Sequence, residues 1–244
     1  MKAPVLVSGI VLLALLGGAG GYLGGQRFDG RVTAGGYAGP LPADAATSPP
    51  PGPTPSGTPS VPLIRKTPEP NPLEALVSTK IDFEVRNFTV SGEVAGEVKL
   101  GLRIPAGWRF TPSKDKPSEV RFVDPSGERA VRVESALNPD KSVKQAMEDV
   151  LANVQSSQPY QNYVQTLFQG AGQVKDDDGK LRNVATLVYT YIPGATTRYV
   201  IVRFVATGDG DLATISMSVT GLPKEQKALE RILAEATASV RIRD

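Results

Sequence analysis

The chain has 244 residues, with 27 Lys and Arg against 25 Asp and Glu, so its formal net charge is only +2. A charge this close to neutral lacks the basic surface that phosphate binding requires, and nucleic acid is not an expected partner. The absence of cysteine and histidine excludes disulfides, thiolate metal sites, a thiol nucleophile and the commonest general base. We therefore expect no cofactor and no lipidated cysteine.

The N-terminus predicts a membrane segment. Lys2 is followed by the uncharged run of residues 3–25, which would span roughly 35 Å as a helix, enough to cross a hydrocarbon core of about 30 Å. Its length favours an uncleaved signal anchor over residues 1–25. A cleaved signal peptide is the alternative, with small residues at 18–20 at the cut. Either interpretation makes the membrane a partner through residues 3–25 and exports the rest of the chain, which would be secreted after cleavage.

Within this run, Gly17, Gly21 and Gly25 recur every four residues. Such spacing lets two membrane helices approach closely, so dimerisation of the anchor is a secondary hypothesis. Glycine is also common in membrane helices without any such role.

Residues 26–72 predict a disordered stalk. Twelve of the 21 prolines lie between Pro40 and Pro72, and Ser48 to Ser60 contains no charged and no large apolar residue. Such a segment cannot bury enough surface to offset its ordering entropy, and proline makes it an extended, semi-rigid spacer. The globular domain is then expected over residues 73–244.

Alternating apolar residues predict strands through most of this domain. Val120 and Phe122 should pair with Val131 and Val133 across the turn at 124–127. The other strands are expected at 81–85, 98–104, 163–168, 184–191, 198–206 and 212–219.

Two helices complete the predicted domain. Ser142 and Gln145 suggest a capping box at the start of the first helix, whose apolar face continues to Val154. The second helix begins after Pro223. Strands joined by short turns predict an α+β fold, a mainly antiparallel sheet with helices packed on it.

Two segments resemble Mog1/PsbP-like domains. The first is Ile104 to Arg109, with its Pro-x-x-Trp, and the second is Leu187 to Val219 followed by a helix and a terminal SVRI. The resemblance covers roughly residues 80–243 and implies an α/β/α sandwich. Such domains occur in actinobacterial cell-envelope lipoproteins of the LpqN kind and in extracytoplasmic regions of membrane kinases. The family has no shared catalytic constellation, so the resemblance implies no particular function.

The candidate ligand-binding residues surround a predicted sheet face lined by hydroxyl groups. Such a groove, rimmed by tyrosines, could hold a peptide or glycan. Trp108 could line a ligand mouth, although core packing is the stronger interpretation because tryptophan buries a large area. The candidates are Trp108, Tyr189, Tyr191, Arg203, Thr214, Ser216 and Ser218.

The sequence favours a binding role over catalysis. Without histidine or cysteine, an enzyme would depend on carboxylates or a Ser–Lys pair, and none has suitable spacing. We therefore expect no enzyme and no metal site, and interpret residues 176–178 as a solvated turn. The first hypothesis is a membrane-tethered extracytoplasmic module that binds an envelope protein, peptide or wall component. The alternative is a carrier or sensor of a small apolar ligand, which requires an enclosed cavity.

Overall fold

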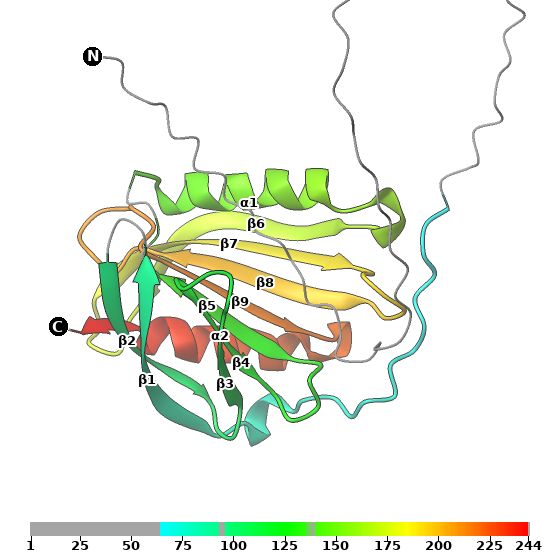
Figure 1. The fold of residues 1–244 in the computed structure, drawn as a ribbon, viewed down its shortest axis with the longest axis horizontal. Coiled ribbons are helices and arrows are strands. Elements are labelled where there is room, and N and C mark those ends of the chain that lie inside the picture. The colour runs from blue at the N-terminus through cyan, green and yellow to red at the C-terminus, as the bar shows by residue number, and fades with distance from the viewer. Residues whose placement is uncertain (1–63, 93–95, 136, 138–139, 244) are drawn as a thin grey trace, which may run out of the picture. The chain divides into compact units, whose positions relative to one another are not determined.

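The structure is a computed structural model that describes residues 64–92, 96–135, 137 and 140–243 (Figure 1). The predicted anchor at 3–25 and the predicted stalk up to residue 63 lie outside the described residues. Within the described part of the chain, no helix has the length and apolar character needed to cross a bilayer.

The centre of the domain is a seven-stranded sheet in which every neighbouring pair is antiparallel. In spatial order its strands are β3 (Arg109–Pro112), β4 (Glu119–Val123), β5 (Ala130–Ser135), β9 (Ile215–Gly221), β8 (Arg198–Val205), β7 (Leu181–Tyr191) and β6 (Gln165–Lys175). The first and last of these, β3 and β6, form the two edges. Alternating sequence therefore folds into the antiparallel sheet that the pattern predicts.

The β4–β5 hairpin confirms its predicted register. Val120 pairs with Val133 and Phe122 with Val131. The turn at 124–127 is closed by a 3.0 Å hydrogen bond from the Gly127 amide to the Asp124 carbonyl. Gly127 has φ +77°, a conformation that costs glycine little because it has no Cβ.

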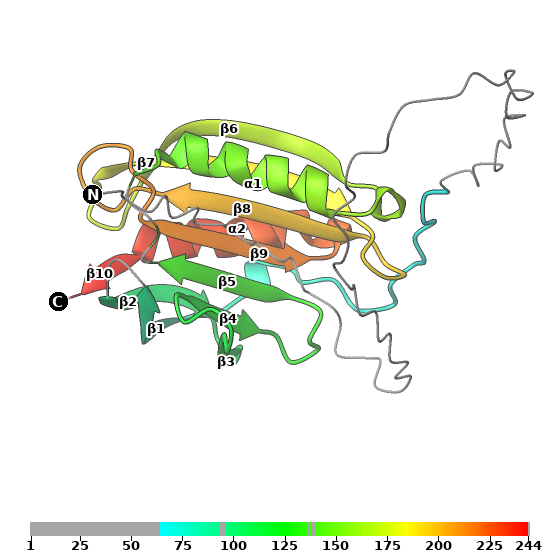
Figure 2. The same cartoon turned by 45° about the horizontal axis from the view of Figure 1, so that its top comes forward.

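The two long helices lie on opposite faces of the seven-stranded sheet (Figures 1 and 2). Helix α1 (Val143–Ser157) begins with the predicted capping box between Ser142 and Gln145 and packs on β7 and β8. Helix α2 (Gln226–Ser239) follows the short helix η3 (Pro223–Glu225) and packs on β8 and β9 from the other side. The α+β fold class with helices on both faces is thereby confirmed.

A second, smaller sheet shares the face that α2 covers. It consists of β1 (Phe83–Gly92), β2 (Gly96–Pro105) and β10 (Arg241–Arg243), with β2 in the middle. The β2 side chains of Leu100, Leu102 and Ile104 are fully buried in the same core as the α2 residue Leu229. The last turn of α2 thus leads into a strand that ties the C-terminus to the small sheet.

Strand β8 separates the two cores of the domain. Its residues Tyr199 and Ile201 belong to the core beneath α2, whereas Val200 and Val202 belong to the core beneath α1. The sequence predicts this arrangement because the strand is apolar on both faces, as a covered central strand should be.

Residues 64–77, which we call the strap, lie along the domain before the first short helix η1 (Ser78–Lys80). Lys66 Nζ donates to Asn162 Oδ1 at 2.6 Å and to the Pro193 carbonyl at 2.7 Å. Further along, the Glu69 amide donates to the Ala195 carbonyl at 2.7 Å. Contacts with the domain therefore start inside the segment that composition assigns to the stalk, eight residues before position 73, where Arg65 Nε donates to Tyr160 Oη at 3.2 Å.

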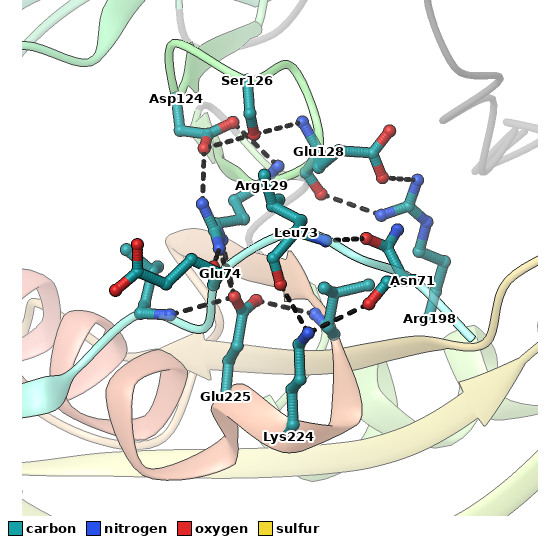
Figure 3. Close-up of polar contacts among 12 residues, drawn as sticks. Asn71, Leu73, Glu74, Asp124, Ser126, Glu128, Arg129, Arg198, Lys224 and Glu225 are labelled. Carbon is teal, nitrogen blue, oxygen red and sulfur yellow. Dashed lines mark hydrogen bonds and ion pairs between the residues drawn. The ribbon is translucent and has the colours of Figure 1, made fainter.

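A buried ionic cluster holds the end of the strap (Figure 3). Arg129 donates from Nη1 to Asp124 at 3.0 Å and from Nε to Glu225 at 2.8 Å, and it also contacts the Glu74 carbonyl. The Glu225 carboxylate in turn accepts from the Leu76 amide at 3.1 Å. One arginine thus joins the β4–β5 turn, the start of α2 and the strap.

Electrostatics favour the charged forms in this cluster. Burial would raise the pKa of Asp124, but hydrogen bonds from Ser126 and Arg129 outweigh it and hold the pKa below its usual value. Burial would lower the pKa of Arg129, but its bonds with Glu225 and Asp124 raise it. Both effects follow from hydrogen bonds to the ionised groups.

Candidate functional site

The structure divides the predicted hydroxyl-lined site between the two faces of the sheet. In the β7–β8 register, Tyr189 pairs with Val200 and Tyr191 pairs with Arg198. Paired residues share a face, so Tyr189 and Tyr191 lie with the even-numbered residues of β8. Arg203 lies on the opposite face with Tyr199, beneath α2.

Tyr189, Tyr191, Ser216 and Ser218 come together beneath α1, where they line a cavity of about 30 Å³. That volume holds a water molecule or two, not a ligand. Burial raises the pKa of Tyr189, and the neighbouring Tyr191 adds to the effect. A carrier of a small apolar ligand would need several hundred Å³ of enclosed space, which this cavity does not provide.

The remaining two predicted residues have local structural contacts. Thr214 donates from Oγ1 to the Val205 carbonyl at 3.0 Å and accepts from the Thr207 amide at 3.0 Å, so it closes the turn between β8 and β9. Trp108 is 5% exposed and belongs to the core shared by the two sheets. Neither lines the cavity beneath α1 or the groove described next.

A larger opening lies beside α2, on the face away from α1. Helix α2 packs on β8, β9 and β2, and the opening extends from this helix across β8 and β7 to β6. The resulting groove, which we call the α2 groove, has a volume of about 520 Å³. It is lined by Leu167, Phe168, Thr186, Val188, Tyr199, Ile201, Arg203, Gln226, Glu230 and Leu233.

The sequence of β6 shapes one wall of this groove. Gly170 pairs with Thr186 and so faces the groove, but it presents no side chain there. The ring of Phe168 lies over Gly170 instead: a Cβ built on Gly170 would be only 2.9 Å from Phe168 Cζ. Leu167 and Phe168 are 55% and 54% exposed. Such neighbouring apolar side chains on an open edge strand are a typical feature of interaction surfaces.

Arg203 is the most informative residue of the α2 groove. Its Nε donates to Thr186 Oγ1 at 3.0 Å and its Nη1 to Thr237 Oγ1 at 3.3 Å. No ion pair joins it to any carboxylate of the described residues. Burial lowers the pKa of its guanidinium, because the charged form loses hydration and gains no opposite charge nearby.

Several other buried or half-buried arginines of the domain have acidic partners. Arg129 pairs with two carboxylates, Arg182 lies 2.8 Å from Asp176, and Arg132 lies 3.3 Å from Glu119. A half-buried guanidinium without a countercharge is costly unless a ligand supplies the missing anion. Perturbed ionisable groups of this kind in a cleft are candidates for a binding site.

The other end of the α2 groove is acidic. Glu230 accepts from Gln226 Nε2 at 2.8 Å, one helical turn away. Burial raises the pKa of Tyr199, and the charge of Glu230 adds to that effect. Between the two charged ends, the floor consists of the buried apolar side chains of Val188, Ile201 and Leu233.

The sequence pattern indicated Arg203 but not the apolar wall of the groove. The predicted strand at 163–168 is observed as β6 over Gln165–Lys175, with a bulge between Thr166 and Phe168. The adjacent Leu167 and Phe168, in a strand otherwise made of small and polar residues, were the available signal. A period of two cannot place both of them on one face; the bulge does so.

The aspartates at 176–178 each contact an arginine. Asp176 lies 2.8 Å from Arg182, Asp177 lies 2.8 Å from Arg103, and Asp178 lies 2.9 Å from Arg241. Asp176 also accepts from the Lys180 and Asp178 amides. This segment is therefore a hydrogen-bonded turn between β6 and β7.

Comparison with solved structures returns the Mog1 fold that the sequence resembles. The chain is similar to the Ran-binding protein Mog1p of Saccharomyces cerevisiae, with 13% identity and a TM-score of 0.42 over 65% of this chain and 96% of that one. It is also similar to LpqN of Mycobacterium tuberculosis, described as involved in cell envelope biogenesis. Here the identity is 16% and the TM-score 0.42, over 66% of this chain and 92% of that one. No family model and no curated protein matches the sequence.

Proposed function

We propose that this protein is a membrane-tethered extracytoplasmic binding module without catalytic activity, and that its α2 groove receives a protein, peptide or wall component of the cell envelope. The observation that carries the proposal is Arg203, a half-buried guanidinium that two threonines orient and no described carboxylate neutralises. A positioned charge of this kind suits the recognition of an anionic ligand group.

The tether and the location rest on the sequence. The apolar run at 3–25 would hold the chain in the membrane, and the proline-rich residues after it would extend the domain outward. The noncatalytic role rests on the lack of histidine and cysteine in the whole chain.

Proximity labelling in the cells that carry the gene tests this function. The labelling enzyme is fused to the full chain, and the wild type is compared with Arg203→Gln and with the control Arg109→Gln. Arg109 is exposed on β3, at the opposite edge of the sheet from β6. The proposal expects labelled envelope components that Arg203→Gln loses and Arg109→Gln retains. Labelling restricted to cytosolic proteins, or equal labelling by all three chains, would contradict it.

A further inference from the structure

We propose that the ligand of the α2 groove is a short extended peptide of about four residues, with its free carboxylate on Arg203 and its amino group beside Glu230. This rests on the proposed binding function and specifies the chemical class of the ligand. Three features of the groove support this ligand: the charges at its two ends, the distance between them and the apolar floor that joins them.

The distance between the charged ends follows from the two elements that border the groove. On β8, Tyr199 and Arg203 are four residues apart, or about 13 Å along the strand. On α2, Glu230 and Thr237 are seven residues apart, or about 10 Å along the helix. Thr237 accepts a hydrogen bond from Arg203 at one end of the groove, and the charge of Glu230 raises the pKa of Tyr199 at the other. The strand and the helix therefore span the same two ends. An extended peptide advances about 3.3–3.6 Å per residue, so three to four residues fit.

The basic end has the geometry for a carboxylate. A guanidinium has five N–H donors, and those of Arg203 make two hydrogen bonds, with Thr186 and Thr237. The other donors can form the forked pair of bonds that arginine makes with carboxylates. Because Thr186 and Thr237 are both buried, they hold the guanidinium in place before a ligand arrives, which lowers the entropy cost of binding.

The acidic end and the floor favour a peptide over a fatty acid. Both would place a carboxylate on Arg203, but the tail of a fatty acid would then lie beside Glu230 and Gln226, which are polar and exposed. A peptide instead brings a protonated amino group to Glu230 and sets apolar side chains on Val188, Ile201 and Leu233. Complementary charges at both ends also fix the direction of the bound peptide.

Titration calorimetry on the full chain in lipid nanodiscs tests the ligand class. The probes are the tetrapeptide Ala-Leu-Val-Ala, its C-terminal amide, its N-acetylated form, and decanoate, with empty nanodiscs as the blank. We expect the free tetrapeptide to bind, and each capped form to bind at least about tenfold more weakly, because each loses one charge-assisted contact. Decanoate should bind more weakly than the tetrapeptide.

Matched variants assign each cap to its residue. Arg203→Gln should bind the free tetrapeptide at least about tenfold more weakly than the wild type does. This variant should bind the free tetrapeptide and its C-terminal amide with equal affinity. Glu230→Gln should likewise bind the free tetrapeptide more weakly than the wild type does, and should bind the free and the N-acetylated tetrapeptide with equal affinity. Because Glu230 is exposed, this variant should fold normally. Arg203→Lys keeps the charge without the fork and should fall between wild type and Arg203→Gln. Arg109→Gln should bind as the wild type does.

The results separate this inference from the broader function. Failure of the free tetrapeptide to bind, or equal affinity for the free and capped peptides, would overturn the peptide assignment. If decanoate binds tightly and depends on Arg203 while the tetrapeptide does not bind, the ligand class is wrong but the groove still binds. The proposed function is tested separately by the labelling in cells, and it fails when that labelling is restricted to cytosolic proteins or is independent of Arg203.

Discussion

Removing the arginine of the buried cluster should destabilise the domain severely. Arg129 is 7% exposed in its side chain, and its partners Asp124 and Glu225 are 4% and 0% exposed. Arg129→Met would leave two carboxylates buried without their countercharge and would remove a donor from the Glu74 carbonyl. Breaking a buried pair by deleting one partner costs about 3–5 kcal/mol. We expect a loss in that range.

Urea unfolding of the full chain in detergent micelles measures this loss. Trp108 is the only tryptophan and is buried in the core, so its fluorescence reports unfolding of the domain. The matched control is Arg109→Met, an exposed substitution expected to change stability by no more than about 0.5 kcal/mol. If Arg129→Met costs less than about 1 kcal/mol, the ionic cluster does not hold the strap and the reasoning is refuted.

Three further predictions use the same unfolding assay. The pKa of Asp124 is lowered in the folded state. Its carboxylate therefore contributes to stability above the unfolded pKa of about 3.9, and this contribution is lost as the pH falls through the folded pKa. Asp124→Asn should therefore unfold with a shallower dependence on acid than the wild type. The pKa of Tyr189 is raised in the folded state, so its neutral hydroxyl contributes to stability below about pH 10 and this contribution is lost at higher pH. The stability of Tyr189→Phe should therefore fall less at alkaline pH than that of the wild type. Gly221→Ala should cost about 1–3 kcal/mol, because a Cβ there would lie 2.9 Å from buried Leu229. Gly172→Ala, where a Cβ meets nothing within 4 Å, should cost less; equal costs would contradict the packing argument.

Local patterns in the sequence predicted much of the fold. The capping box at Ser142, the register of the β4–β5 hairpin and the central position of β8 each depend on residues close together in the chain. Propensity, turn chemistry and burial agree at these places, so the sequence alone is informative.

The candidate site was harder to predict because it depends on pairing between strands. Alternation shows which residues of one strand share a face, but only the register shows which faces of two strands coincide. Tyr189 pairs with Val200, not with Tyr199, so the predicted cluster of Tyr191 and Arg203 separates onto two faces. The bulge that turns Leu167 and Phe168 toward the α2 groove likewise has no signature in the alternation.

Photo-crosslinking in cells tests most directly whether the α2 groove is a binding site. A photoreactive amino acid is placed in the full chain at Leu167, which is 55% exposed on the groove, or at Val85, which is 65% exposed on β1 of the small sheet. The proposed function predicts a crosslinked product from Leu167 that disappears when Arg203→Gln is added, and none from Val85. Crosslinks that are equal at both positions, or unchanged by Arg203→Gln, would contradict it.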